Sequence, residues 1–320
     1  MSLCPFGGVD AGMEFGKVDS LDGVEWALPP DPPLTEHVLG QLPDRDEARV
    51  YVGSTAWGQR GFVGTVYPRG TKPGGQLAAC GRQFNAIELN ASFYRVPDRA
   101  QVLKWYAAVP DDFRFCPKVN KAISQASDLG IATSRTLDFA KAIQHFEHKL
   151  GPCFIQLPGD FTTERWAALE AWLADWPPHL RLAVELRHES WFSTSTGADA
   201  FAAFAARGIG SVITDVAGRR DAAHMQITAP FAVVRWVGNV DETDHARLLA
   251  WAQRCVRWTR EGLGEVYVFT HQPEELPSAR SAAEFARAIR AAAPEGFQIQ
   301  TRAPRFEGVP SDSPAQGQLF

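Results

Sequence analysis

The chain has 320 residues, of which 45% are apolar and 22% charged, and its formal net charge at pH 7 is −5. These values are typical of a globular protein that can bury a core, and they exclude a global electrostatic attraction to nucleic acid or anionic membranes. No apolar run approaches the roughly 20 residues of a membrane span, and the N-terminus shows no signal-peptide pattern. The five cysteines have neither zinc-ligand nor C-x-x-C spacing. We therefore expect a reduced, cytoplasmic protein without membrane contact.

The two ends of the chain differ in composition from the rest. Residues 1–49 are rich in Gly, Pro and Asp, which predicts an irregular N-terminal arm with one short helix near residues 35–42. Residues 303–320 are rich in Pro, Ser and Gly, which predicts a flexible C-terminal tail. Residues 50–302 are expected to form the folded domain between them.

Eight short apolar runs of strand type recur between the ends, separated mostly by stretches with apolar residues every three or four positions, as in helices. The stretch 217–230, between the sixth and seventh runs, is short and polar, so we expect a short helix or none there. The predicted strands are 50–55, 84–90, 113–119, 153–158, 181–187, 210–216, 231–237 and 265–271. The predicted helices are 99–109, 134–150, 163–176, 197–207, 241–262 and 278–293.

Strands that alternate with helices indicate a parallel sheet with right-handed crossovers. Eight such units predict an α/β fold, a closed eight-stranded (β/α)8 barrel of the TIM type. The alternative is an open, doubly wound sheet. However, the segment after the first strand, GSTAWGQRGFVG, lacks the G-x-G-x-x-G pattern typical of that arrangement. The sequence therefore favours the barrel.

Every predicted strand ends in a hydrogen-bonding or ionisable residue, which apolar packing alone does not require. In a (β/α)8 barrel, the carboxyl ends of the strands form the active-site face. Because side chains two positions apart share a face of a strand, Glu88 and Asn90 are expected to point inward together. The candidate catalytic residues are Glu88, Glu185, His188 and Asp215. The candidate substrate-binding residues are Asn90, Tyr94, Lys118, Arg187, Arg235, Trp57, Trp191 and His271.

Buried carboxylates need positive partners, so we expect a mixed-charge cluster in which Lys118, Arg187 and Arg235 match the inward carboxylates. Lys118 and Arg187 are the expected partners of Glu88. The same residues are also compatible with a polar layer that only stabilises the barrel. The three aromatic candidates fit either a stacking rim for a ligand or anchors for the loops. A divalent metal held by the carboxylates and histidines is a further alternative. Because no local ligand motif is present and cations are close by, we expect no metal or cofactor.

Six segments together resemble the DUF72 family, also called YecE-like. They are VGSTAWGQRGFVGTVYP, FNAIELNASFYRVP, WYAAVPDDFRFCPKV, FIQLP, LAVELRHESWF and VVRWVGN, spread over about residues 50–290. The resemblance implies a TIM-barrel-type fold and supplies no reaction, because the family is named for its unknown function. The residues that match the family pattern are Gly53, Trp57, Tyr67, Pro68, Glu88, Asn90, Phe93, Tyr94, Lys118, Gln156, Glu185, Arg187, His188, Trp191 and Arg235.

Two positions depart from the family pattern. Many members carry Leu-His-Gly after the arginine that matches Arg235, whereas this chain has WVG at 236–238. Many members carry Phe-Asn-Asn after the eighth strand, whereas this chain has FTH at 269–271. The imidazole and amide groups of those members are therefore absent here or replaced by His271.

The chain ends in QGQLF, which resembles the short peptide by which bacterial proteins dock on the replicative sliding clamp. Gln316, Leu319 and Phe320 would be the contacts, since two apolar anchors on a disordered tail suit a groove. The second position is Gly where Leu is usual, so chance composition is the alternative.

Three functions are compatible with these observations. The first is an enzyme of hydrolase or lyase type whose small anionic substrate, perhaps phosphorylated, binds the cations at the barrel mouth. In that case Glu88 or Glu185 would be the general acid or base. The second is a nucleic-acid transaction or repair factor that docks on the clamp, and the third is a small-ligand binding protein without turnover.

Overall fold

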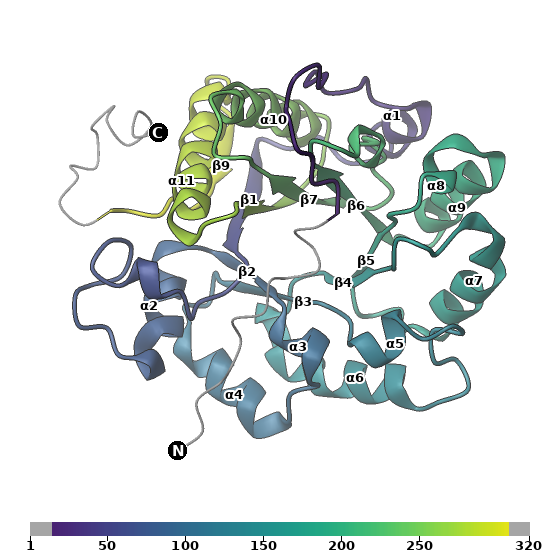
Figure 1. Cartoon of the computed structure of the whole chain (residues 1–320), viewed down its shortest axis with the longest axis horizontal. Coiled ribbons are helices and arrows are strands. Elements are labelled where there is room, and N and C mark those ends of the chain that lie inside the picture. Colours follow the sequence, from purple (N-terminus) through teal and green to yellow (C-terminus); the bar gives the residue numbers. More distant parts are fainter. Residues whose placement is uncertain (1–14, 307–320) are drawn as a thin grey trace.

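The computed structural model describes residues 15–306, which form a ring of eight parallel strands surrounded by helices (Figure 1). This confirms the eight-stranded α/β barrel predicted from the sequence, and each strand lies within or close to a predicted one. The barrel strands are β1 (Glu47–Ser54), β2 (Ala86–Leu89), β3 (Arg114–Pro117), β4 (Cys153–Gln156), β5 (Leu182–Glu185), β6 (Gly210–Asp215), β7 (Phe231–Val237) and β8 (Glu265–His271).

The strands pair in the order β3-β2-β1-β8-β7-β6-β5-β4, and their ladders are parallel. Between β3 and β4 the described residues form isolated bridges in place of a ladder, at Phe115–Leu150 and Lys118–Phe154. Pro117 ends β3 and has no amide hydrogen to donate to such a ladder. The barrel is therefore nearly closed, with its weakest seam between β3 and β4.

Alternation of side chains along the strands divides the apolar core into two clusters. The inner cluster fills the barrel and includes Tyr51, Cys116 and Tyr267. The outer cluster, to which Val50 and Ile87 belong, lies between the strands and the helices. Both faces of the sheet are thus covered, which explains why the strands read as continuous apolar runs. The same alternation decides which polar residues at the strand ends face the barrel axis.

Helices follow most of the strands and cover the outside of the barrel (Figure 1). They are α1 (Pro33–Leu39), α2 (Gln76–Gln83), α3 (Ala91–Tyr94), α4 (Arg99–Ala108), α5 (Lys121–Ser124), α6 (Arg135–Ile143), α7 (Trp166–Asp175), α8 (Ser190–Ser193), α9 (Ser195–Ala206), α10 (Thr243–Arg260) and α11 (Glu275–Ala292). Short 3-10 turns are η1 (Arg60–Phe62), η2 (Pro73–Gly75), η3 (Gln144–Lys149), η4 (Thr163–Arg165) and η5 (Arg220–Ala222). Between β6 and β7 the described helical structure is the short η5, in agreement with the prediction.

Several elements differ from the sequence prediction, among them the short helices α3, α5 and α8, which were not predicted. The helix expected over 134–150 is split, because Glu147 has a positive φ of 47° that no helix continues through. Helix α2 was not predicted, since its short sequence QLAACGRQ follows two glycines and contains a third. A ninth strand, β9 (Gln298–Gln300), was also missed, and it pairs in parallel with the start of β1.

The N-terminal segment that precedes β1 crosses the face of the barrel at which the strands end (Figure 1). Its first described part lies along the loop after β6, where the amide of Gly218 donates to the carbonyl of Gly16 at 2.8 Å. Nε of Arg220 donates to the carbonyl of Glu25 at 3.0 Å. Within α1, the hydroxyl of Thr35 donates to the carbonyl of Met225 at 2.7 Å. The segment is therefore attached first to the barrel mouth and then, through Thr35, to the chain that runs along the outside of β6.

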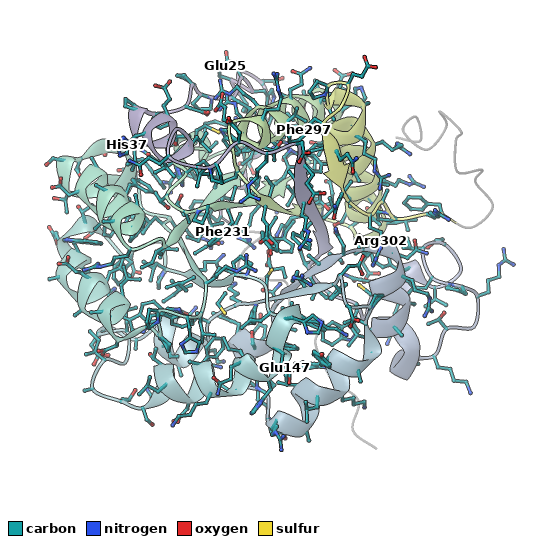
Figure 2. The ribbon with its side chains drawn as sticks, turned by 180° about the vertical axis from the view of Figure 1, so that it is seen from behind. Glu25, His37, Glu147, Phe231, Phe297 and Arg302 are labelled. Carbon is teal, nitrogen blue, oxygen red and sulfur yellow. The ribbon has the colours of Figure 1, made fainter. Side chains whose placement is uncertain are left out.

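The reverse view shows the opposite end of the barrel, at which the strands begin. Phe231, the first residue of β7, lies near the middle of this view, and Arg302 lies to one side of it (Figure 2). None of the helices within residues 15–306 combines the length and the apolar character that a membrane crossing requires.

Candidate functional site

Arg235 on β7 lies between two buried carboxylates at the C-terminal end of the barrel. Its Nε and Nη2 atoms donate to Oε2 and Oε1 of Glu88 at 3.0 and 3.2 Å. Its Nη1 atom donates to Oε1 and Oε2 of Glu185 at 2.9 and 3.0 Å. The two carboxylates are fully buried and the guanidinium nearly so. Arg235 thus links β2 and β5 across the barrel by charge-assisted hydrogen bonds.

Glu185 receives further donors from its neighbours in the ring of strands. Nε2 of Gln156 donates to Oε2 at 2.7 Å, and Nε of Arg187 donates to Oε1 at 3.1 Å. The hydroxyl of Thr214 reaches Oε1 at 3.3 Å. Burial alone would raise the pKa of Glu185, but Arg235, Arg187 and Gln156 outweigh it and lower the pKa to about 2. At neutral pH Glu185 is therefore a fixed negative charge.

The carboxylate of Glu88 also has hydrogen-bonding partners besides Arg235. The amide of Asn90 donates to Oε1 at 3.0 Å, and Nε2 of His271 lies 3.0 Å from Oε2. Burial would raise the pKa of Glu88, but Arg235 and His271 hold it well below its ordinary value. Because an ionised carboxylate only accepts hydrogen bonds, Nε2 of His271 carries the proton in this contact. The partners of Glu88 are thus Arg235 and His271, where we had expected Lys118 and Arg187.

Two further cations complete the cluster. Lys118, directly after β3, is 2% exposed, and its Nζ lies 4.4 Å from the centre of the Phe93 ring. Its charge contributes to the low pKa of Glu185. The guanidinium of Arg187 lies 4.6 Å from the ring of Phe15 in the N-terminal segment. The cluster therefore contains three cations and two carboxylates, without counting His271.

The three aromatic candidates do not form a shared rim. Trp191 is 1% exposed and donates from Nε1 to the carbonyl of Phe161 at 2.6 Å, so it is a core residue. Trp57 is partly buried, and its ring meets that of Trp105 edge-on at 5.4 Å. Tyr94 ends α3 and remains 41% exposed. Of the three, Tyr94 is the most exposed, and its ring is contacted by Phe93 at 5.1 Å and by Nζ of Lys121 at 5.8 Å.

Asp215 does not join the cluster, because it lies on the outer face of β6. It forms ion pairs with Arg220 and with Arg247, the latter at 3.0 Å, and it accepts from Nε1 of Trp251 at 2.5 Å. The ring of Trp26 lies over both arginines, at 5.3 and 4.2 Å. This corrects the expectation from the sequence: Asp215 fastens α10 and the N-terminal segment to β6.

His188 also lies apart from the contacts of Arg235. The backbone amide of Ser190 donates to its Nδ1 atom at 3.2 Å, and the hydroxyl of Ser190 lies 2.9 Å from the same atom. In the neutral ring the proton is therefore on Nε2. His188 is held at the start of α8, beside the cluster, and the contacts do not show a role for it.

The donor set does not resemble a metal centre. Within residues 15–306, no three side chains of His, Cys, Asp or Glu come together as a ligand group. A guanidinium lies between Glu88 and Glu185, at the position that a shared cation would need.

Two contributors to the cluster were missed in the sequence. Thr214 immediately precedes Asp215, and the alternation of β6 would have selected it. Phe15 gave no signal, because it lies in a segment whose path over the barrel depends on tertiary contacts.

The fold and the buried charges define a (β/α)8-type barrel protein with a cation-rich cluster at the face where such barrels carry their active sites. Residues 51–305 match the model of a family described as "Protein of unknown function DUF72". The chain belongs to this DUF72 family.

Two curated relatives share this similarity. The UPF0759 protein YecE of Escherichia coli is 27% identical over 246 residues, which span 70% of this chain and 87% of YecE. The UPF0759 protein YunF of Bacillus subtilis is 26% identical over 151 residues, which span 45% of this chain and 52% of YunF.

Solved structures of the family agree with the fold. A DUF72 family protein from Enterococcus faecalis matches with a TM-score of 0.62 at 19% identity, covering 75% of this chain and 95% of the other. A DUF72 family protein from Thermotoga maritima matches with a TM-score of 0.60 at 22% identity, covering 76% of this chain and 99% of the other. At these identities the likeness concerns the fold alone.

Proposed function

We propose that this chain is an enzyme of hydrolase or lyase type that binds a small anionic substrate, bearing phosphate or carboxylate, at the C-terminal mouth of the barrel. The observation that supports this is the gathering of three cations at the carboxyl ends of the strands. Arg235 binds both buried carboxylates, and Lys118 and Arg187 add positive charge on the same side of the barrel. Guanidinium and ammonium groups held in place in this way suit the binding of a phosphate or carboxylate.

The low pKa values of Glu88 and Glu185 argue against the role of general acid or base that we had expected for them. In this proposal they hold the cations in place. The group that exchanges a proton is His271, which Glu88 orients through Nε2 as carboxylates orient histidines in hydrolytic sites. Within the described residues, no donor reaches the buried Oδ1 atom of Asn90. That atom would accept from a hydroxyl or amine of the substrate.

Calorimetric titration of the full chain with phosphate, phosphorylated metabolites and small dicarboxylates tests the binding step. The variant Arg187→Met should weaken binding roughly 10- to 150-fold, because a hydrogen bond to a charged group contributes about 1.5–3 kcal/mol. The matched control is Arg207→Met, an exposed arginine that pairs with Glu170 on the outer surface. If the wild type binds none of these anions, or both variants bind equally, the proposal fails.

Turnover is tested separately from binding. Ligands that bind are assayed for hydrolysis and elimination products with the wild type and with His271→Gln, which keeps a donor toward Glu88 and cannot exchange a proton near neutral pH. Binding without product in the wild type would support a ligand-binding protein instead. Docking on a sliding clamp stays a prediction, because Gln316, Leu319 and Phe320 lie outside the described residues.

A further inference from the structure

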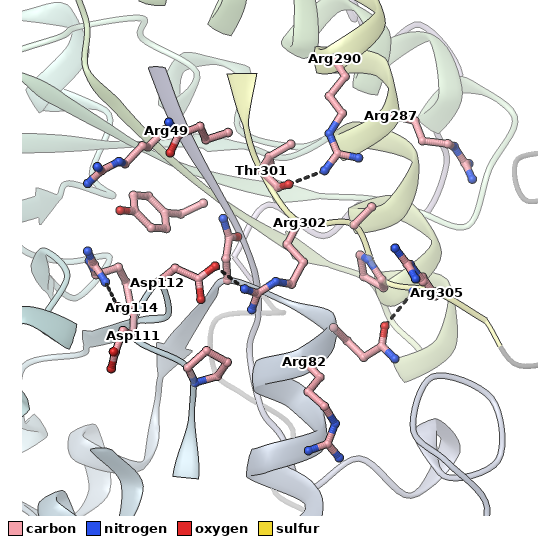
Figure 3. Close-up of a pocket in the computed structure, with 17 residues that line it drawn as sticks. Arg49, Arg82, Asp111, Asp112, Arg114, Arg287, Arg290, Thr301, Arg302 and Arg305 are labelled. Atoms are coloured by element: carbon pink, nitrogen blue, oxygen red, sulfur yellow. Dashed lines mark hydrogen bonds and ion pairs between the residues drawn. The ribbon is translucent and has the colours of Figure 1, made fainter. Parts of the chain in front are cut away.

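A concave region lies at the end of the barrel where the strands begin, opposite the cluster around Arg235. It is a hollow of about 1150 Å³ bounded by the starts of β1 and β3, the end of α2, the loop before β3, the later turns of α11 and the segment after β9 (Figure 3). We call it the basal groove. None of the residues that line it belongs to the cluster around Arg235 at the barrel mouth. The basal groove is therefore a separate feature from the candidate active site.

Positive charge dominates the basal groove. Seven arginines and two aspartates in its lining give a formal charge of +5, whereas the whole chain carries −5. Figure 3 shows the arginines distributed around the hollow on several elements rather than gathered at one point. The arginines are Arg49, Arg82, Arg114, Arg287, Arg290, Arg302 and Arg305. Because they are scattered along the sequence, only the fold brings them together.

The two aspartates in the lining already have partners of their own. Asp111 pairs with Nζ of Lys149 at 3.1 Å, and Asp112 pairs with Arg302. Within residues 15–306, no carboxylate lies within ion-pair distance of Arg49, Arg82 or Arg305, and all three are exposed. The basal groove thus keeps several accessible cations that no carboxylate among residues 15–306 neutralises.

The cations also act on each other. Burial and the neighbouring charge of Arg305 lower the pKa of Arg290, so the two guanidinium groups repel each other. Arg305 is held near α2 because its backbone amide donates to Oε1 of Gln83 at 2.8 Å. Arg302 is fixed by the carbonyls of Gly81 and Phe84. The fold therefore holds like charges together, and an anionic ligand would relieve the repulsion.

The size and chemistry of the groove select the kind of anion. Its volume exceeds the roughly 300–1000 Å³ typical of small-molecule pockets, and a single small anion would reach few of the arginines. Guanidinium groups suit phosphate because they donate two parallel hydrogen bonds. The one aromatic residue in the lining, Tyr51, is 3% exposed and stacks on Tyr267 at 4.5 Å. The groove therefore favours contacts with phosphate groups over the stacking of bases on an aromatic ring.

We propose that the basal groove binds single-stranded nucleic acid through its phosphates, without preference for base sequence. A single strand carries one negative charge per nucleotide and is flexible enough to follow a concave wall. This function is independent of the anionic ligand proposed for the mouth, since the two sites share no residue.

Fluorescence anisotropy with labelled oligo-dT and oligo-U strands of about 20 nucleotides tests the proposal on the full chain. The logarithm of the affinity should fall linearly with the logarithm of salt concentration, by about 0.7 for each phosphate neutralised. The double variant Arg82→Glu with Arg305→Glu should lose at least about tenfold in affinity, and its salt slope should be shallower by about 1.4. Thermal unfolding confirms that the variant is folded.

The matched control is Arg60→Glu with Arg135→Glu, which makes the same charge change at two exposed arginines in η1 and α6, at the other end of the barrel. It should bind strands as the wild type does. The proposal is overturned if the wild type binds no strand, if the basal variant binds like the control, or if poly-glutamate competes as well as an unlabelled strand. The last result would assign the groove to acidic proteins.

Discussion

Nε2 of His271 lies 3.0 Å from Oε2 of Glu88, although the two residues are 183 positions apart in the chain. They belong to β8 and β2, which flank β1 on either side. On β1, Gly53 lies between Ala86 and Phe269, two residues before Glu88 and His271 on their strands, and a Cβ atom on it would lie 2.5 Å from the ring of Phe269. The absence of a side chain at Gly53 gives the inner face of the barrel room for that ring, one layer below the contact.

Replacing Arg235 by Met should destabilise the fold strongly, because Glu88 and Glu185 would lose their shared partner while remaining buried. Breaking one side of a buried ion pair costs about 3–5 kcal/mol. Urea unfolding followed by circular dichroism measures the change in the free energy of unfolding. Arg207→Met, which breaks an exposed pair, should cost no more than about 1 kcal/mol. A loss for Arg235→Met as small as the control's would contradict this account of the cluster.

The pKa of Glu185 predicts how stability changes in acid. It is about 2 in the folded chain and about 4.3 when unfolded, so the unfolded state takes up the proton first as the pH falls. Stability from this group is present above about pH 4.3 and is lost as the pH falls toward 2. Unfolding free energies measured across this range should fall less steeply for Glu185→Gln than for the wild type. The exposed control Glu189→Gln should follow the wild type, and parallel curves for all three would refute the assignment.

His224 should make the free energy of unfolding depend on pH between about 6.5 and 4. Its ring is partly buried, its Nδ1 atom accepts from the amide of Gln226 at 3.0 Å, and desolvation lowers its pKa to about 4. The unfolded ring titrates near 6.5, so the unfolded state binds the proton first and stability falls as the pH drops from 6.5 toward 4. At pH 5 the free energy of unfolding that is lost in this way is about 2 kcal/mol. The difference in unfolding free energy between pH 7 and pH 5 should shrink in His224→Phe and stay unchanged in the exposed control His179→Asn.

The contact between Phe15 and Arg187 should compete with ligands at the mouth. A cation–π contact of this kind contributes about 0.5–1 kcal/mol, which corresponds to a change of roughly 2- to 5-fold in affinity. Phe15→Ala should therefore tighten the binding of an anion at Arg187 by that factor in calorimetric titration. Phe15→Leu, which keeps an apolar side chain but no ring, should behave like the alanine variant. Weaker binding in both would mean that Phe15 helps to hold the ligand.

The main features of the barrel could be predicted from the sequence because each strand is a continuous apolar run that is buried on both faces. Glu88 with Asn90, and Glu185 with Arg187, followed directly from the alternation of side chains along a strand. The same rule, applied to β6, would have chosen Thr214 over Asp215.

Other features could not be predicted from local patterns. Trp191 and Tyr94 are both aromatic residues in loops, and only packing decides that one is buried and the other open. The basal groove escaped notice because its arginines lie at strand starts and helix ends, where charged residues are ordinary. The positive charge of the basal groove arises only when folding brings its arginines together, because the chain as a whole carries a net charge of −5.

Strand β9 gives the first barrel strand a partner from nearly the last residues described. Glu47 to Arg49 of β1 lie opposite Gln298 to Gln300, and the later part of β1 lies opposite β8. During synthesis, a nascent chain that has produced β1 through β7 still leaves one edge of β1 unpaired. That edge is completed only after β8 and β9 have been made. Pairing of β1 is therefore complete only once residue 300 has been synthesised, and a chain shortened before β8 would expose an open strand edge prone to aggregation.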